Sequence, residues 1–179
     1  MTRVIPKFLL PLLLLVVAGM VNAQAAGAWE GYRGAQFGMS QQEVEASFEA
    51  NGVELLGAIE TADNDVILEA QRGDGASAVH LRYIFPAAHA QLALVIEFLP
   101  DTGLFERHRA HLTARYGQPW SADLTEWTLE QMGDNLPDGA QDLVAWGGGE
   151  GNRTRFVRLW THEEHLSVEY IDAGLLSGY

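Results

Sequence analysis

The sequence of 179 residues contains no cysteine, and its single lysine, Lys7, lies close to the start. The lack of cysteine excludes disulfides, thiol catalysis, zinc–thiolate sites and a lipid anchor attached to cysteine. Twenty-four acidic residues stand against 11 basic ones, which gives a formal net charge of −13. A chain this acidic, with no basic stripe, repels nucleic acid. We therefore expect neither a nucleic-acid partner nor a lipid anchor.

Residues 1–25 have the composition of an export signal. Arg3 and Lys7 precede an apolar run of 14 residues, and small residues follow it at Ala23 and Ala25. The run is shorter than the roughly 20 residues of a membrane-spanning helix, so we expect no membrane span. Cleavage is predicted after Ala25, with Ala23 as the alternative. Removing 25 of the 179 residues, of which two are basic and none acidic, leaves 154 residues and shifts the net charge from −13 to −15.

Motifs for covalent catalysis are missing from the rest of the chain. There is no Gly-x-Ser-x-Gly elbow, and the glycine-rich stretch at residues 147–152 lacks the Lys-Ser/Thr ending and the following helix of a phosphate-binding loop. We interpret this stretch as a hairpin loop that is available to touch a partner. No catalytic residue and no cofactor are predicted. With 24 acidic residues, a carboxylate pair for hydrolysis stays an alternative.

A capping motif in the stretch FGMSQQEV predicts where the first helix begins. Ser40 can cap the helix, and Glu43 can reach back to the Ser40 amide. Met39 can pack against Val44, as in a hydrophobic staple. The sequence therefore predicts an amphipathic helix over residues 41–51, and the motif is explained as a helix start rather than as a binding or catalytic site.

After this helix the apolar pattern changes to a period of two, which is typical of strands. Four stretches show it, with short turns between them: VELLGAIE, DVILEAQR, ASAVHLRYIF and QLALVIEFL. In the last of these, Leu94, Ile96 and Phe98 alternate with Val95 and Glu97. We expect four antiparallel strands.

The second half of the chain repeats this layout in outline. The stretch LFERHRAHLTARY predicts a second helix, which Gly117 and Pro119 end. Four strand candidates follow it, at residues 124–132, 141–147, 153–161 and 165–171. The sequence thus predicts one α+β domain over residues 26–179, made of two tandem units at about 34–99 and 100–172. Each unit has one helix and four antiparallel strands, and the helices are expected on one face of a sheet whose other face is free.

Two motifs carry a family resemblance. F-G-M-S-x-x-E-V opens the first helix at residues 37–44, and L-x-x-R-Y-G-x-P closes the second at residues 112–119. These motifs resemble those of small exported envelope proteins of the BamE (SmpA/OmlA) and β-lactamase-inhibitor-protein-like group. The resemblance implies a non-enzymatic protein that binds another protein in the envelope or outside the cell.

Two histidine pairs are the candidates for a metal site. His108 and His111 are three residues apart on the predicted second helix, so both can face one ion, and His162 and His165 flank two glutamates. Imidazole with carboxylate suits zinc. However, residues three apart on an extended strand point to opposite faces, and a hydrogen-bonded core histidine is the ordinary alternative for His108.

The remaining candidate is a group of arginines and tryptophans on predicted neighbouring strands of the second half: Arg153, Arg155, Arg158, Trp127, Trp146 and Trp160. Arginine and tryptophan on an open sheet are typical of protein-binding hot spots. The alternative is that the tryptophans lie in the core and the arginines neutralise nearby acids.

Together these patterns predict an exported, periplasmic or secreted, non-enzymatic protein-interaction module, such as an inhibitor or an envelope assembly factor. Its expected partner is another envelope or extracellular protein. A periplasmic metal- or small-ligand-binding protein is one alternative, and an envelope hydrolase that uses paired carboxylates is another.

Overall fold

The structure is a computed structural model that describes residues 29–133, 136–149 and 153–176. The expected signal peptide with both cleavage positions, and residues 150–152 of the glycine-rich stretch, lie outside the described residues. No helix in the described parts combines the length and the apolar composition that crossing a membrane requires.

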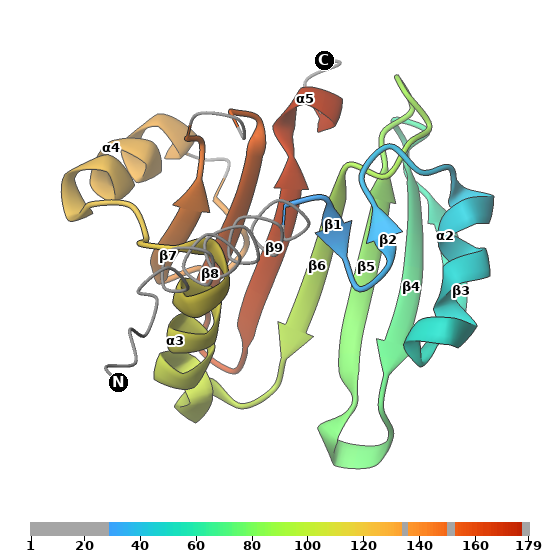
Figure 1. The fold of residues 1–179 in the computed structure, drawn as a ribbon, viewed down its shortest axis with the longest axis horizontal. Helices are drawn as coiled ribbons and strands as arrows, with labels where there is room; N and C mark the ends of the chain where they lie inside the picture. The colour runs from blue at the N-terminus through green and yellow to red at the C-terminus, as the bar shows by residue number, and fades with distance from the viewer. Residues whose placement is uncertain (1–28, 134–135, 150–152, 177–179) are drawn as a thin grey trace, which may run out of the picture.

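A seven-stranded antiparallel sheet forms the centre of the fold (Figure 1). Its strands are, in chain order, β3 (Val53–Glu60), β4 (Val66–Arg72), β5 (Val79–Phe85), β6 (Leu94–Leu99), β7 (Asp142–Gly147), β8 (Arg155–Thr161) and β9 (Leu166–Asp172). They lie side by side in the order β3-β4-β5-β6-β9-β8-β7. The last strands of the two halves, β6 and β9, therefore pair at the centre, while β3 and β7 form the edges. With its helices, this sheet makes the chain an α+β protein.

The described residues form four α-helices: α2 (Gln41–Phe48), α3 (Phe105–Tyr116), α4 (Ala122–Met132) and α5 (Ala173–Leu176). Three short 3-10 turns accompany them: η1 (Glu49–Asn51), η2 (Gly75–Ser77) and η3 (Thr102–Leu104). The first turn extends α2, and the third leads into α3. The predicted helices at residues 41–51 and 105–116 are thus present.

The hydrogen bonds at the start of α2 confirm the predicted capping motif. Ser40 Oγ accepts from the Glu43 N–H at 3.4 Å, and Glu43 Oε2 accepts from the Ser40 N–H at 2.8 Å. Met39 packs against the core cluster that contains Val44. Gly52 follows the helix with φ 63°, a left-handed conformation that glycine adopts without steric cost. The motif therefore positions a helix.

All four strands predicted for the first half are present, and β6 reveals which of its faces is buried. The face toward α2 and α3 carries Val95, Glu97 and Leu99, all buried, whereas the positions from Leu94 to Phe98 that alternate with them are half-buried on the other face. The more apolar side of β6 is therefore the more open one. The buried side of β6, by contrast, places the carboxylate of Glu97 in the main core.

The first strand predicted for the second half is wrong, because residues 124–132 belong to α4. Ser121 caps this helix by accepting the Leu124 N–H at 3.3 Å. The hydroxyls of Thr125 and Thr128 donate to carbonyl groups four residues earlier, so these β-branched residues satisfy their polar groups inside the helix. The second half therefore has two long helices and three strands instead of one helix and four strands.

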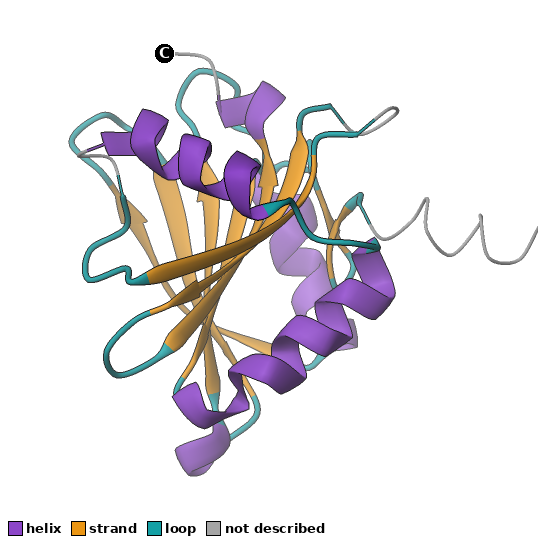
Figure 2. Ribbon diagram, turned by 90° about the vertical axis from the view of Figure 1, so that its left-hand side faces the viewer, coloured by secondary structure: helices purple, strands orange, loops and turns teal. Residues whose placement is uncertain are grey.

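The helices lie on both faces of the sheet, which corrects the expectation that one face carries them all. The main core, between the sheet and α2 and α3, includes Phe48 and Leu112. Leu129 and Met132 of α4 pack instead on a second cluster around Trp160. Figure 2 shows α4 and α3 on opposite sides of the twisted sheet. The face opposite the main core is therefore covered at β7 and β8.

A short hairpin that was not expected from the sequence lies across the sheet between α2 and α3 (Figure 1). Its strands, β1 (Gly31–Tyr32) and β2 (Ala35–Gln36), pair antiparallel, and the turn between them holds Arg33 at φ 45°. Tyr32 is 4% exposed and belongs to the main core. The hairpin thereby brings residues of the N-terminal segment to the helix-covered face of the sheet.

Candidate functional site

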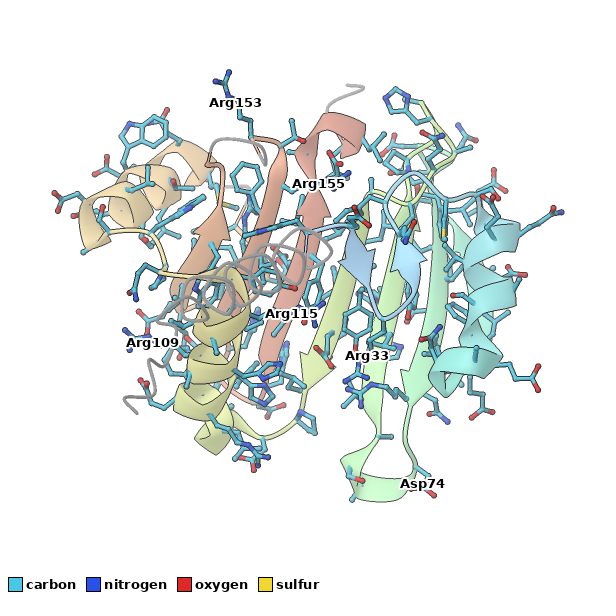
Figure 3. All side chains as sticks on the ribbon, in the orientation of Figure 1. Arg33, Asp74, Arg109, Arg115, Arg153 and Arg155 are labelled. Carbon is cyan, nitrogen blue, oxygen red and sulfur yellow. The ribbon has the colours of Figure 1, made fainter. Side chains whose placement is uncertain are left out.

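A cavity of about 570 Å³ lies between α3, the β1–β2 hairpin and the adjoining ends of β4, β5 and β6. Sites for small molecules commonly enclose about 300–1,000 Å³, so the volume suits such a ligand. The lining comes from both halves of the chain. In Figure 3, Arg33 at the hairpin and Arg115 near the C-terminal end of α3 mark two of the contributing elements.

One face of α3 supplies a cationic row along the cavity. Arg107, His111 and Arg115 recur every four residues, a spacing that places them on one side of a helix. Leu112 and Tyr116 are buried in the main core and fix the orientation of α3. The row is exposed to solvent, so it forms part of the rim of the cavity.

Three arginines in the lining make no ion pair with any described residue: Arg33, Arg107 and Arg115. We call them the rim arginines. The guanidinium of Arg33 lies 5.7 Å from the ring centre of Tyr32, and that of Arg115 lies 5.4 Å from the ring centre of Tyr116. Stacking on a ring leaves the N–H donors at the edge of a guanidinium available. The rim can therefore bind an anion without first breaking an ion pair.

The floor of the cavity holds a buried carboxylate whose charge is already balanced. Glu97 Oε1 accepts from Tyr32 Oη at 2.9 Å and from Arg72 at 2.8 Å, and Oε2 accepts from Tyr170 Oη at 3.3 Å. The Nε of Arg72 is buried and makes no hydrogen bond with the described residues. The floor thus has a neutral ion pair and one unused donor.

The tyrosines around Glu97 stay protonated. Burial, reinforced by the negative charge of Glu97, raises the pKa of Tyr32 to about 12. The same two causes raise the pKa of Tyr170 well above its ordinary value. A phenol with a raised pKa keeps its proton at neutral pH, so both hydroxyls act as hydrogen-bond donors to the carboxylate.

His108 lines the cavity beside the cationic row, and its pKa is lowered. Burial is the main cause, Arg107 and His111 act in the same direction, and Glu97 opposes them. A histidine whose pKa is lowered from 6.5 is neutral at pH 7. It therefore offers one donor and one acceptor nitrogen and adds no charge to the lining.

The charge of the cavity lining is opposite in sign to that of the whole chain. Four arginines (the rim arginines and Arg72) and two carboxylates (Glu97 and Asp101) give the lining a net charge of +2 with histidines neutral. The formal net charge of the chain is −13. The acidic remainder of the molecule favours cations, so this cavity is a local exception.

The sheet face opposite the main core has a different character over β3 to β6. No described helix packs there, and an apolar row crosses these four strands in register: Ile59, Ile67, Ile84 and Leu94. On the edge strand β3, Leu56 and Ile59 are 52% and 50% exposed. We call this surface the open apolar face.

The predicted group of arginines and tryptophans does not form one surface. Trp146 is 0% exposed and lies in the main core, while Trp160 is 1% exposed and belongs to the second cluster on the other side of the sheet. Trp127 lies on α4 rather than on a strand and is 57% exposed. These three tryptophans therefore occupy three separate environments.

The arginines of that group are mostly paired within β8 and β9. Arg155 donates to Asp172 at 3.1 Å, and Arg158 lies 3.6 Å from Glu169. Arg153, in the segment before β8, is exposed. Neutralisation of nearby acids, the alternative interpretation, thus describes two of the three arginines.

The two histidine pairs lie in different places. His108 and His111 both line the cavity. His162 and His165 lie in the turn between β8 and β9 rather than on an extended strand, and their rings stack with centres 4.2 Å apart. His162 has a partner at each ring nitrogen, at 3.2 Å and 3.0 Å, and burial lowers the pKa of His165. Within the described ranges, no group of three or more His, Asp and Glu is placed to hold a metal ion.

Most residues of the cavity were not among the sequence candidates, and the polar ones include Arg33, Arg72, Glu97, Arg107, Arg115 and Tyr170. Two signals in the sequence bear on them. The spacing Arg-x-x-x-His-x-x-x-Arg within the predicted second helix places two arginines and a histidine on one face. A glutamate in the apolar strand LVIEFL is also unusual, and a buried carboxylate requires partners. The hairpin residues gave no such signal.

Comparisons with models of protein families, with curated proteins and with solved structures found no match to this chain. The geometry offers two surfaces of different chemistry: a cavity with a cationic rim and an open apolar face. The function has to be inferred from these two.

Proposed function

We propose that this chain is an exported, non-enzymatic binding protein that holds a small organic anion in the cavity between α3 and the β1–β2 hairpin. The observation that carries the proposal is the set of rim arginines, which lack ion pairs with the described residues in a chain of formal net charge −13. Arginine presents several N–H donors in a planar array that suits carboxylate and phosphate oxygens. A bound anion would complete these interactions.

A binding role explains the carboxylates of the cavity better than hydrolysis does. Glu97 accepts hydrogen bonds from three side chains, and Asp101 accepts the N–H of Gly103 at 2.9 Å. Both groups thus act as acceptors that hold the local structure. A general acid or base needs to reach a proton on the substrate, and neither carboxylate is free to do so without giving up these bonds.

The proposal also includes that the chain is exported and that its two halves are tandem units. The strand order places the last strands of the two halves, β6 and β9, side by side, with three further strands outside β6 and two outside β9. Two tandem units joined at their last strands, one of them with a strand fewer, would give this order. The resemblance of residues 37–44 and 112–119 to small exported envelope proteins favours a non-enzymatic role outside the cytoplasm. In this proposal the two halves enclose the ligand between them.

Calorimetric titration with small organic anions, such as octanoate, tests the anion site. We expect binding that weakens about tenfold in the double variant Arg107→Gln/Arg115→Gln, because each exposed ion pair contributes up to about 1 kcal/mol. The matched control is Arg109→Gln on the outer side of the same helix, where Arg109 pairs with Glu106 at 3.5 Å. Absence of binding by any organic anion, or an equal loss in the control, would refute the proposal.

Protein binding through the open apolar face is a second candidate function. It is favoured by the apolar row across β3 to β6 and by Leu56 and Ile59 on the unpaired edge strand, which are 52% and 50% exposed. Exposed apolar side chains beside an unpaired strand edge are typical of surfaces that another chain covers.

Site-specific cross-linking in the producing cell tests this second candidate. A photoreactive residue at Ile59 should give one discrete adduct, because the partner would cover the edge of β3. The same residue at Glu126, on the exposed side of α4, is the control. Adducts of the same size at both positions, or none at Ile59, would count against protein binding through this face.

A further inference from the structure

The cavity has a charged rim above a mostly apolar wall. Arg33, Arg107, His111 and Arg115 are exposed, whereas the wall below them includes a set of buried or half-buried apolar residues: Val79, Leu99, Leu104, Leu112 and Val168. Leu99, Leu112 and Val168 are at most 6% exposed, so the apolar surface that still meets water includes that of Val79 and Leu104. A purely hydrophilic anion would leave that surface in contact with water. A ligand with an apolar body would remove it from water, at about 25 cal/mol per Å².

The rim has more positive charge than one negative charge can balance. The rim arginines carry three charges, and among the described lining residues the only carboxylate outside the Arg72–Glu97 pair is Asp101. The uncompensated charge at the rim is therefore +2.

We infer that the ligand is an organic molecule with two negative charges on an apolar body. The inference rests on the proposed anion-binding function and specifies its ligand class. The two charges match the net charge of the rim, and the apolar body matches the wall beneath it. Such a ligand enters body first and keeps its charged groups at the rim, where they stay partly hydrated.

The length of the cationic row admits two arrangements of the charges. Arg107 and Arg115 are eight residues apart, which corresponds to about 12 Å along a helix, with His111 midway. A phosphate monoester places both charges on one group and would contact neighbouring members of the row. A dicarboxylate places one charge at each end and would span the row. Both share the chemistry that the site requires.

Four probes of known charge and apolarity test the ligand class by calorimetric titration of the purified protein at low salt. Octyl phosphate and suberate carry two charges on an apolar body, octanoate carries one charge, and inorganic phosphate has no apolar body. We expect octyl phosphate or suberate to bind more tightly than octanoate, by up to about fivefold, since one more exposed ion pair contributes up to about 1 kcal/mol. Inorganic phosphate should bind more weakly still.

The rim variants separate the sources of affinity. Arg33→Gln should weaken the doubly charged probe about fivefold and octanoate less, because a single charge needs fewer partners. The better of octyl phosphate and suberate identifies which of the two charge arrangements the site prefers. Arg109→Gln should leave all four affinities unchanged.

Failure of the ligand class is distinguishable from failure of the proposed function. If octanoate binds as tightly as both doubly charged probes, and Arg107→Gln/Arg115→Gln still weakens its binding, the ligand does not need two charges. The proposed anion site would then remain supported. If inorganic phosphate binds as tightly as octyl phosphate, the inference that the ligand has an apolar body is wrong. Absence of binding by all four probes overturns both.

Discussion

The hydroxyl of Tyr32 donates a hydrogen bond of 2.9 Å to Oε1 of Glu97, 65 residues further along the chain. Arg72 and Tyr170 donate to the same carboxylate, so one side chain joins the hairpin to β4 and β9. Glu97 is 8% exposed, and a buried charge is tolerated only when such partners replace water. The carboxylate is therefore the point at which the cavity is assembled.

Replacing Glu97 with alanine should destabilise the protein by about 3 kcal/mol, because it leaves the partly buried guanidinium of Arg72 without its counter-charge. Tyr32→Phe should cost about 2 kcal/mol, since it removes one hydrogen bond to a charged group. Urea unfolding curves measure both free energies of unfolding. The matched control is Tyr116→Phe: the hydroxyl of Tyr116 is buried and makes no hydrogen bond with the described residues, so its removal should cost nothing. An equal loss in both tyrosine variants would contradict the role given to the Tyr32 hydroxyl.

The stability of the protein should fall as the pH drops from about 6.5 to 5. Burial lowers the pKa of His108 and that of His165, so below pH 6.5 the unfolded chain binds more protons than the folded protein. Urea midpoints at a series of pH values measure the slope. His108→Gln should flatten it, and the double variant with His165→Gln should flatten it further. A gain in stability on acidification within this window would show that the sign is wrong.

Ser40→Ala should destabilise the protein by about 1 kcal/mol, because the Glu43 N–H loses its side-chain acceptor at the start of α2. Ser47→Ala, within the same helix, is the control. The Ser47 hydroxyl donates only to the Val44 carbonyl, a bond that helices do not require. The Ser47→Ala variant should therefore lower the free energy of unfolding by no more than about 0.5 kcal/mol. Thermal unfolding of the three proteins compares the two sites. Equal melting temperatures for all three would mean that the cap contributes nothing.

Two tryptophan variants test the placement of α4. Trp127→Ala should change the free energy of unfolding by less than about 0.5 kcal/mol, because the side chain is 57% exposed. Trp146→Ala should cost about 4 kcal/mol, because the side chain is 0% exposed in the main core. Chemical unfolding monitored by circular dichroism avoids reliance on tryptophan fluorescence. A large loss in Trp127→Ala would mean that α4 buries the opposite side of the helix.

The sequence predicted the elements whose signals are local. The capping motif at Ser40 located α2, and the period-two pattern located β3 to β6 and the last three strands. The strand predicted at residues 124–132 was wrong, because the apolar residues there are spaced three, two and three apart, which is closer to the period of a helix than to that of a strand. Thr125 and Thr128, whose type is common in strands, are accommodated because their hydroxyls donate to carbonyl groups inside the helix.

The cavity could not be predicted because it depends on contacts between distant segments. In β6, for example, the apolar pattern predicts the wrong buried face. Leu94, Ile96 and Phe98 form the more apolar side of the strand, yet the side with Glu97 faces the core. Only the arrival of Tyr32, Arg72 and Tyr170 from three other segments makes that burial possible. The tryptophan candidates failed for a related reason, since period two gives the alternation of a strand but not which side is covered.

The pairing of β6 with β9 at the centre of the sheet has a consequence for the order of assembly. β6 is complete at Leu99, but its partner begins at Leu166, so the inner edge of the first half has no strand beside it until the end of the chain has been made. Unpaired edges invite contact with other chains. A protein clipped before β9 would lose Tyr170 from the cavity floor and expose that edge at the same time. The floor of the cavity and protection from aggregation therefore depend on the same last strand.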